Sequence, residues 1–394
     1  MNQVKLESVC DIKNGYAFKS TEFLKEGIPL LRISSFDNGP VKIDKKTVYV
    51  NQNNLVTKSD FKVEKGDILI ALSGATTGKY GIYTDNEPSL LNQRVGLLKS
   101  GKATELSGKY FYYYLSILQT EIFRKAGGAA QPNISTKAIG EMLIPLPPLE
   151  QQKKIASILD AADTYRQKTK ALIAKYDELT QSLFLDMFGD PVKNEKGWEM
   201  VSLSQYGSFK NGLNYNKGES GVSIKYLGVG DFKSKSKIDD LKSLSNIELN
   251  NIPSEGHLLN NGDLVFVRSN GNKALVGRCI EIYPCETKLT FSGFCIRYRI
   301  KSLNIKPTYL SHLFRNKSFK KLMLQSGQGA NIQNINQKIL SSIKVPLPSE
   351  TLQDKFVTSI QYIEQQKKSA QAGFEKADEL FNSLLQKAFN GELI

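Results

Sequence analysis

The chain presents one ordered series of short motifs twice. The matched pairs include Gly66–Leu69 with Gly262–Val265, Pro145–Pro147 with Pro346–Pro348, and Asp177–Leu179 with Asp378–Leu380. Their offsets lie between 196 and 201 residues, and offsets that vary this little arise from loop insertions between two copies of one fold. The 394 residues are therefore predicted to form two tandem copies of one domain arrangement.

Each copy divides into a globular part and a long helix. The globular parts contain short strand-like runs between turns rich in Gly and Asn. Prolines 147, 148 and 348 suit the first positions of the helix that follows each globule. We therefore predict an α+β fold, in which two tandem-repeated α/β globules are joined by two long helices. The predicted segments are 1–147 (first globule), 148–188 (central helix), 189–347 (second globule) and 348–394 (C-terminal helix).

The apolar residues of the predicted helices are spaced alternately by three and four residues. This spacing is that of a coiled-coil seam, and a seam without a partner would leave a wide apolar stripe in water. We therefore predict that the two helices pair with each other. The predicted helix-pair interface is formed by Ile155, Ile158, Ala162, Tyr165, Leu172, Tyr176, Leu179 and Leu183, and by Phe356, Ile363, Ala370, Leu380 and Leu384. The second seam is the weaker one, because it contains Ser359, Gln366 and Gly373.

The positive charge of the chain is concentrated on the predicted globules. The whole chain has a formal net charge of +14. Segments 1–148 and 189–348 carry net charges of +5 and +11, whereas the helical segments 149–188 and 349–390 carry 0 and −1. Basic globules favour a polyanionic partner such as nucleic acid, and near-neutral helices favour protein contacts.

The sequence lacks the motifs of common catalytic and metal sites. Four cysteines without a CxxC pair and only two histidines provide too few ligands for a structural zinc site. Residues 73–80 resemble a phosphate-binding loop, but Ser73 replaces its first glycine and Tyr80 replaces its magnesium-binding hydroxyl residue. We therefore expect no catalytic residues and no metal site. The absence of a signal peptide and of a long apolar run predicts a cytoplasmic protein without membrane contact.

Three segments resemble one known protein family. The first globule ends in Ile144–Ile155 (IPLPPLEQQKKI), the next helix contains Asp177–Leu179, and the chain finishes in Ala388–Leu393 (AFNGEL) and the final isoleucine. Together with the duplicated layout, these segments resemble the specificity (S) subunit of type I restriction–modification systems. The resemblance covers essentially the whole chain, although the globules match in layout rather than in individual residues.

The resemblance implies a DNA-recognition subunit that catalyses nothing itself. Each globule would be a target recognition domain that reads one half of a bipartite, asymmetric site in double-stranded DNA. The two helices would pack antiparallel as a coiled coil, fix the spacer between the half-sites and give a pseudo-twofold arrangement. Two modification (methyltransferase) subunits and restriction (translocase–endonuclease) subunits would dock on the chain. The methyl donor and ATP would bind those partners, so no cofactor is expected in this chain.

The candidate DNA-binding residues lie in turns that both copies place at equivalent positions. Arg and Lys can pair with guanine or phosphate, and Asn and Gln can pair with adenine, through matching donors and acceptors. In the first copy the predicted residues are Tyr16, Lys19, Ser73, Thr76, Thr77, Lys79, Arg94, Gln131 and Asn133. In the second copy they are Asn211, Tyr215, Lys217, Arg268, Asn270, Asn272, Lys273, Arg278, Gln328, Asn331 and Gln333.

Three other functions are compatible with the sequence. The chain could be the specificity subunit of another multisubunit restriction–modification assembly, which its copurifying subunits would distinguish. It could carry a cryptic nuclease site, in which case the purified chain would cut plasmid DNA in the presence of magnesium. It could also be a coiled-coil scaffold without a DNA role, which predicts no salt-dependent affinity for DNA.

Overall fold

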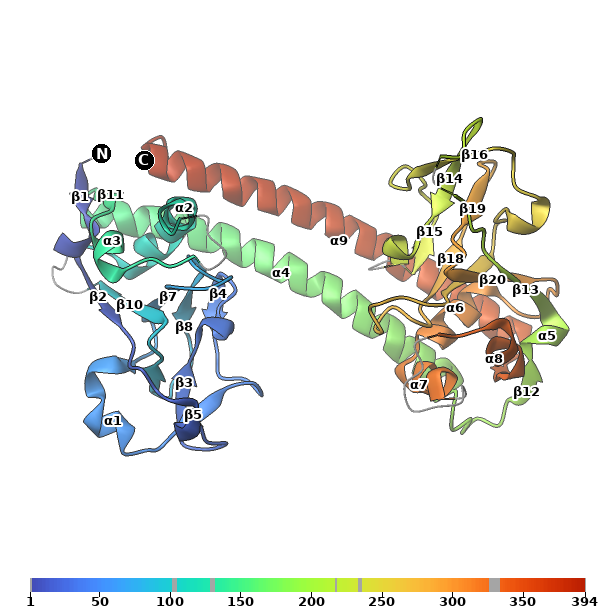
Figure 1. Ribbon diagram of the computed structural model, residues 1–394, viewed down its shortest axis with the longest axis horizontal. Helices are drawn as coiled ribbons and strands as arrows, with labels where there is room; N and C mark the ends of the chain where they lie inside the picture. Colours follow the sequence, from blue (N-terminus) through green and yellow to red (C-terminus); the bar gives the residue numbers. More distant parts are fainter. Residues whose placement is uncertain are drawn as a thin grey trace. The chain divides into compact units, whose positions relative to one another are not determined.

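The chain folds into two compact units, each of which combines one globule with parts of both long helices. The computed structural model describes residues 2–100, 105–127, 132–216, 218–232, 236–325 and 334–393 (Figure 1). Unit 1 comprises Met1–Thr169 and Ala372–Ile394, and unit 2 comprises Lys170–Gln371. The two long helices are α4 (Leu149–Phe188) and α9 (Glu350–Asn390).

Unit 1 is built around a five-stranded sheet with the strand order β2-β10-β7-β8-β4. Its neighbouring strands run antiparallel except β4, which pairs with β8 in parallel. A second sheet has the order β5-β3-β9-β6, and β1 pairs with β11. The strands are β1 Gln3–Lys5, β2 Cys10–Asn14, β3 Ile28–Leu31, β4 Gly39–Val41, β5 Val48–Val50, β6 Lys62–Val63, β7 Ile68–Ala71, β8 Tyr80–Tyr83, β9 Ser89–Leu91, β10 Val95–Ser100 and β11 Leu143–Pro145. The shorter helices are α1 Asn54–Thr57, α2 Gly108–Lys125 and α3 Thr136–Gly140.

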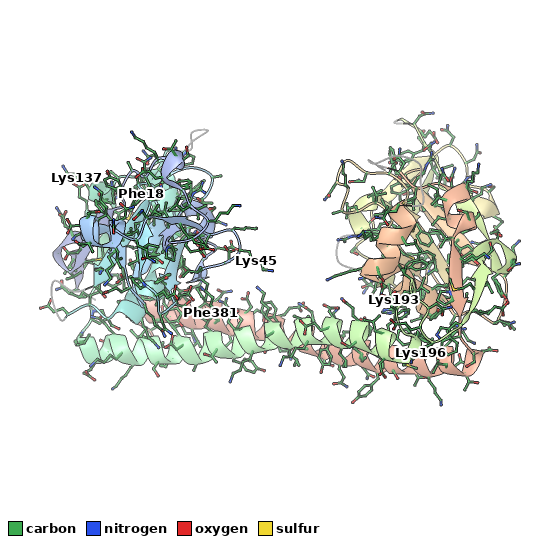
Figure 2. The ribbon with its side chains drawn as sticks, turned by 90° about the horizontal axis from the view of Figure 1, so that it is seen from below. Phe18, Lys45, Lys137, Lys193, Lys196 and Phe381 are labelled. Carbon is green, nitrogen blue, oxygen red and sulfur yellow. The ribbon has the colours of Figure 1, made fainter. Side chains whose placement is uncertain are left out.

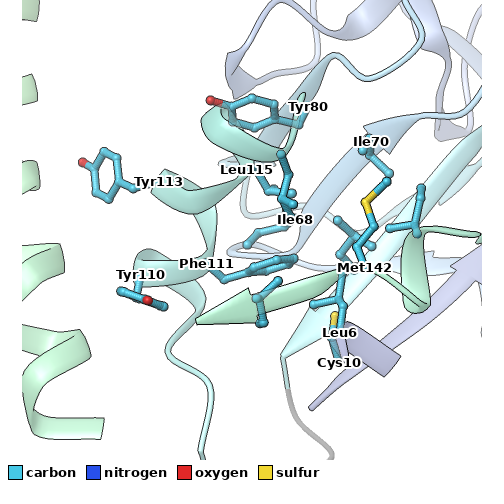
Figure 3. Close-up of a cluster of buried hydrophobic side chains, with 14 of the residues drawn as sticks. Leu6, Cys10, Ile68, Ile70, Tyr80, Tyr110, Phe111, Tyr113, Leu115 and Met142 are labelled. Carbon is cyan, nitrogen blue, oxygen red and sulfur yellow. The ribbon is translucent and has the colours of Figure 1, made fainter. Parts of the chain in front are cut away.

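The central strand β7 is apolar throughout because both faces of the sheet are covered. Successive side chains of a strand point to opposite faces. Ile68 and Ile70 belong to the buried cluster that contains Phe111 of α2, as Figure 3 shows. Leu69, between them, belongs to a separate buried cluster with Leu97 on the other face. The four-residue run of β7 therefore supplies two hydrophobic cores.

Unit 2 repeats this topology. Its five-stranded sheet has the order β13-β20-β17-β18-β15, a second sheet has the order β16-β14-β19, and β12 pairs with β21. The strands are β12 Glu199–Ser202, β13 Gly207–Asn211, β14 Val222–Leu227, β15 Lys237–Ile238, β16 Asn246–Leu249, β17 Asp263–Val267, β18 Cys279–Ile282, β19 Leu289–Phe291, β20 Cys295–Ile300 and β21 Lys344–Leu347. The shorter helices are α5 Leu203–Tyr206, α6 Pro307–Arg315, α7 Lys317–Gln325 and α8 Gln337–Ser342. The prediction of an α+β fold in two tandem copies is confirmed.

The long helices pack antiparallel within each unit. As the residue numbers rise along α4, the numbers of the α9 residues that contact them fall. The contacting pairs are Arg166 with Asp378 and Thr169 with Gly373 in unit 1, and Asp177 with Lys367 and Phe184 with Phe356 in unit 2. The first part of α4 and the last part of α9 therefore belong to unit 1, and the remaining parts belong to unit 2.

A buried glutamine fixes the start of each long helix. Gln152 Nε2 donates to the carbonyls of Glu105 and Pro147 at 2.7 and 2.8 Å, and its Oε1 accepts from the Ser107 amide at 2.8 Å. In unit 2, the Gln353 side chain makes the same three hydrogen bonds, with the backbone of Asn304, Lys306 and Pro348. Each glutamine thus ties its helix to the loop before the helix that covers the sheet.

The end of α4 is closed by residues that satisfy its last carbonyls. Gly189 follows the helix with a φ of 77°, a left-handed conformation that favours glycine at a helix C-terminus. Lys196 Nζ lies 3.1 Å from the Met187 carbonyl, and Trp198 Nε1 donates to the Phe188 carbonyl at 2.9 Å. Figure 2 shows Lys196 beside this end of the helix. A cation there also interacts favourably with the helix dipole.

The buried seam of α4 differs from the predicted one at every second position. The side chains of Ile158, Tyr165, Leu172 and Leu179 are exposed, as is Leu380 on α9, so these five predictions are wrong. On α4 the next residue faces inward instead, because Leu159, Arg166, Ile173 and Thr180 are buried or half-buried. The other predicted positions that are buried or half-buried are Ile155, Ala162, Tyr176, Leu183, Phe356, Ile363, Ala370 and Leu384.

The seam is shifted because each helix packs against a globule as well as against the other helix. Leu159 lies in the same buried cluster as Phe111 of the globule. Arg166 is accommodated in the seam since its Nη1 lies 2.9 Å from Asp378 Oδ1 and its guanidinium lies 4.2 Å from the Phe381 ring centroid. Figure 2 shows Phe381 on the side of α9 that faces this globule. An ion pair with a cation–π contact offsets the cost of placing this charge inside.

Candidate nucleic-acid interface

Four segments of unit 1 meet at one end of its five-stranded sheet. We call them the unit 1 turn cluster, which consists of residues 15–19, 72–79, 92–94 and 132–135. Backbone hydrogen bonds join these segments. The Leu72 amide donates to the Arg94 carbonyl, the Ile134 amide donates to the Leu72 carbonyl, and the Tyr16 amide donates to the Leu91 carbonyl, each at 2.9 Å. Turns that lie far apart in the sequence, from residue 15 to residue 135, therefore form one surface.

Unit 2 builds an equivalent surface with the same hydrogen bonds. The unit 2 turn cluster consists of residues 211–216, 268–278, 292–294 and 334–336. The Arg268 amide donates to the Phe294 carbonyl at 2.7 Å, and the Ile335 amide donates to the Arg268 carbonyl at 2.9 Å. An isolated bridge pairs Ser269 with Asn334, as another pairs Ser73 with Asn133 in unit 1. The two clusters thus share one backbone arrangement.

Most of the predicted unit 1 residues are accessible on this surface. Lys19, Arg94 and Asn133 are exposed, and Tyr16 and Lys79 are half-buried. Ser73 and Thr76 are also half-buried, but their hydroxyl oxygens are buried, contrary to the prediction that they face DNA. Lys79 Nζ lies 2.9 Å from Asp37 Oδ1, so a phosphate would compete with this carboxylate for the lysine. The Tyr16 ring carries the Lys58 ammonium at 4.1 Å from its centroid, a cation–π contact that adds positive charge beside the cluster.

In unit 2 the predicted residues form a polar and cationic turn. Asn211, Tyr215, Asn272 and Lys273 are exposed, and Arg268, Asn270 and Arg278 are half-buried. Asn270 Oδ1 accepts from the Asn272 amide at 2.8 Å, and Asn272 Oδ1 accepts from the Ala274 amide at 3.0 Å. Arg278 Nη1 donates to the Phe232 carbonyl at 3.1 Å. These contacts fix the turn and hold the Arg278 guanidinium in place.

The Thr77 side chain, which the sequence predicts to face DNA, is buried in the structure. The residue is only 4% exposed, and its Oγ1 lies 2.7 Å from the Gly74 carbonyl and 2.9 Å from the Pro132 carbonyl. The hydroxyl therefore holds two segments of the cluster together. The sequence did not reveal this role, because a threonine in a turn has the same signature whether it faces solvent or the neighbouring segment.

Five predicted residues lie outside the described residues. They are Gln131, Lys217, Gln328, Asn331 and Gln333.

Phe294 is the residue of the unit 2 turn cluster that sequence reasoning missed. It is 61% exposed, although its neighbours Phe291 and Cys295 are buried. Hydrogen-bonding and charged side chains are the common readers of base edges, and an apolar side chain in a turn lacks that signature. Its equivalence to Arg94, 200 residues earlier in the repeat, was a signal in the sequence that could have identified it.

The two histidines have lowered pKa values and structural surroundings. Burial, with a smaller contribution from Arg315, lowers the pKa of His312 to about 3. Its ring lies edge-on to Phe356, with 5.3 Å between the ring centroids. Burial also lowers the pKa of His257, whose Nδ1 lies 3.1 Å from Ser254 Oγ. Both rings therefore pack as neutral side chains at neutral pH.

The described part of the chain holds neither a metal-binding cluster nor a membrane-spanning helix. No group of three or more His, Cys, Asp or Glu side chains there is arranged to hold a metal ion. No helix of the described residues is long and apolar enough to cross a membrane.

Comparison with known proteins identifies relatives along the whole chain. The sequence model of the family described as type I restriction modification DNA specificity domain matches residues 1–177 and again residues 195–371. The chain is 25% identical to the specificity subunit of the type I restriction enzyme StySPI from Salmonella potsdam, over 98% of this chain and 88% of that protein. The EcoKI specificity subunit from Escherichia coli strain K12 is also 25% identical, with 98% of this chain and 88% of that protein covered.

A solved structure shares the fold. The crystal structure of the type I restriction–modification S subunit from M. genitalium superposes with a TM-score of 0.57 at 18% sequence identity, covering 98% of this chain and 96% of that chain. A duplicated specificity domain is thus the class of protein that the two units define. The chain belongs to the type I restriction modification DNA specificity domain family.

Proposed function

We propose that this chain is the DNA-recognition subunit of a type I restriction–modification system, and that each turn cluster reads one half of a bipartite, asymmetric DNA site. The observation that carries the proposal is that the two clusters share one backbone arrangement but present different side chains. Arg94 in unit 1 corresponds to Phe294 in unit 2, for example. A shared backbone places both clusters on DNA in the same way, whereas different side chains select different bases.

The charge of the clusters supports binding to the DNA backbone. Unit 1 presents Lys19, Lys79 and Arg94, and unit 2 presents Arg268 and Lys273 together with Arg278 at their surfaces. Neutralising phosphates with such groups releases counterions, so the affinity for DNA should fall steeply as the salt concentration rises. A coiled-coil scaffold without a DNA role would show no such dependence.

The exposed apolar residues of α4 support protein partners on the long helices. In unit 1, Ile158 and Tyr165 are exposed and seven residues apart, and in unit 2 Leu172 and Leu179 are exposed with the same spacing. A spacing of seven places side chains on one side of a helix, where a partner helix can pack. We assign this surface to two modification (methyltransferase) subunits, with restriction subunits joining the same assembly.

In this proposal the chain itself catalyses no step. The methyl donor and ATP bind the partner subunits, and the chain supplies the sequence specificity. Purified chain incubated with magnesium and plasmid DNA should leave the plasmid intact. Cleavage by the chain alone would support the nuclease alternative and overturn this assignment.

The direct test is reconstitution of the chain with the modification subunits of its host system. We expect the complex to methylate one bipartite motif, mapped by single-molecule sequencing of a plasmid library, and to bind a duplex containing that motif with strong salt dependence. Methylation without a sequence motif, or at a continuous motif, would contradict the proposal.

A further inference from the structure

Phe294 lies in a turn whose backbone is fixed by hydrogen bonds. Its carbonyl accepts from the Arg268 amide at 2.7 Å, and its own amide donates to Ser292 Oγ at 3.2 Å. The preceding Gly293 amide donates to the Leu213 carbonyl at 2.8 Å. The ring therefore projects from a rigid position, and 61% of the residue is exposed.

Residues with polar side chains lie beside Phe294 in the turn cluster. A Cβ atom at Gly293 would lie 1.8 Å from Asn214 Oδ1, so the Asn214 side-chain amide lies directly against this glycine. The backbone amides of Arg268 and Ser269 donate to the Phe294 carbonyl, at 2.7 and 3.4 Å. Phe294 belongs to none of the buried clusters of unit 2. The exposed phenyl ring thus projects from a turn whose neighbouring residues include Asn214, Arg268 and Ser269.

The equivalent position in unit 1 carries a cation. The Leu72 amide donates to the Arg94 carbonyl at 2.9 Å, as the Arg268 amide does to the Phe294 carbonyl in unit 2. Both residues occupy the turn before the strand that pairs with the central strand of the sheet, β10 or β20. The same backbone site therefore offers a guanidinium in one unit and a phenyl ring in the other.

We propose that Phe294 is a specificity-determining residue that contacts the C5-methyl group of a thymine in the half-site read by unit 2. This inference rests on the proposed function, since it names a base contact of the same surface. The thymine methyl is the one apolar group on the major-groove edges of the bases, and it is the group that an aromatic side chain among polar neighbours can recognise. Arg94 at the equivalent site pairs with guanine, so the two half-sites differ at corresponding positions.

The test removes the methyl group from the DNA and the ring from the protein separately. Binding of the complex with its modification subunits is measured on duplexes that carry its methylation motif, with each thymine of the unit 2 half-site replaced in turn by uracil. At one position, uracil should weaken binding by the unmodified complex about three- to fourfold, the effect expected for losing one buried methyl group. The same replacement should have no effect on the Phe294→Ala complex.

Two further variants separate the contact from other effects of substitution. Phe294→Leu keeps an apolar side chain and should retain part of the uracil effect. Leu303→Ala removes an apolar side chain that is 85% exposed elsewhere in unit 2, and it should behave as the unmodified complex on every duplex.

The outcomes distinguish this inference from the proposed function. If the complex binds its motif but Phe294→Ala leaves every uracil effect unchanged, Phe294 does not read thymine. If Phe294→Ala weakens binding to all duplexes equally, the ring stacks on or between bases and the thymine contact is wrong. A unit 2 half-site without thymine overturns the inference as well. The absence of any sequence preference in the unmodified complex would instead overturn the proposed function.

Discussion

Arg94 presents an exposed guanidinium from a turn that is held by the backbone of Leu72. A guanidinium that pairs with guanine through two hydrogen bonds contributes about 1–3 kcal/mol of discrimination against other bases. Arg94→Ala should therefore reduce discrimination at one base pair of the first half-site by about tenfold. The measurement is competition binding with duplexes altered at single positions. Equal loss of affinity for all duplexes would instead assign Arg94 to a phosphate.

His312 provides a test of stability against pH. The pKa of His312 is about 3 in the folded chain, and an unfolded histidine has a value of about 6.5. Between these values the unfolded chain binds a proton that the folded chain does not, so the free energy of unfolding falls as the pH is lowered from about 6.5 towards 3. The energetic cost of His312→Gln, measured by denaturant unfolding, should shrink by about 2 kcal/mol between pH 8 and pH 5. An equal cost at both pH values would contradict the buried, neutral histidine.

The exposure of individual turn residues could not be predicted from the sequence. Residue type and turn position identified Arg94 as an exposed polar group, but they did not separate it from Thr77, whose hydroxyl faces inward. They also did not identify Phe294. Exposure at a turn depends on which distant segment packs against it, and that information is distributed over the whole globule.

At the scale of elements, the buried glutamines at the start of α4 and α9 hold each long helix to its globule. Gln152→Ala would leave the carbonyls of Glu105 and Pro147 and the amide of Ser107 without their partner. We expect the free energy of unfolding to fall by about 3 kcal/mol, since unsatisfied buried polar groups cost about 1–3 kcal/mol each and some of them will find water. Denaturant unfolding measures this loss. Gln361→Ala on the exposed surface of α9 is the control and should change the free energy of unfolding little. Similar losses in both variants would contradict the role of Gln152 in holding α4 to its globule.

The exposed residues of α4 lead to a prediction about assembly. Tyr165→Glu should weaken binding of the modification subunits by at least tenfold. The substitution replaces the aromatic side chain of the proposed apolar docking surface with a charged one. Thermal unfolding of the chain alone should be unchanged, since Tyr165 is exposed. Ala171→Glu, at another exposed position of the same helix, tests whether any added charge has this effect. Unchanged binding by Tyr165→Glu would place the partner elsewhere.

The helices show which part of an element can be predicted from spacing. The heptad pattern predicted two long paired helices, and both are present. It placed Ile158 and Tyr165 in the seam, where the structure has Leu159 and Arg166. Apolar residues occur on two adjacent stripes of α4. Spacing alone does not tell which stripe packs against the other helix and the globule, and which stripe stays exposed for a partner.

At the scale of the whole molecule, the internal repeat was the most informative feature of the sequence. It predicted the duplicated fold, which the matching strand orders of the two units confirm. Of the repeated motifs, Pro145–Pro147 lies where a strand ends and a long helix is about to begin, and Asp177–Leu179 lies within α4. The details of the binding surface were not predictable in the same way, since the residues that differ between the copies are those proposed to read different bases.

The central claim is that each unit reads one half-site independently, and exchange of one globule tests it most directly. Residues 1–147 are replaced by the corresponding segment of a relative with another target, and the methylation motif of the reconstituted complex is mapped by single-molecule sequencing. We predict a bipartite motif in which one half changes to that of the relative while the other half is unchanged. A motif in which both halves change, or in which neither does, would contradict the account.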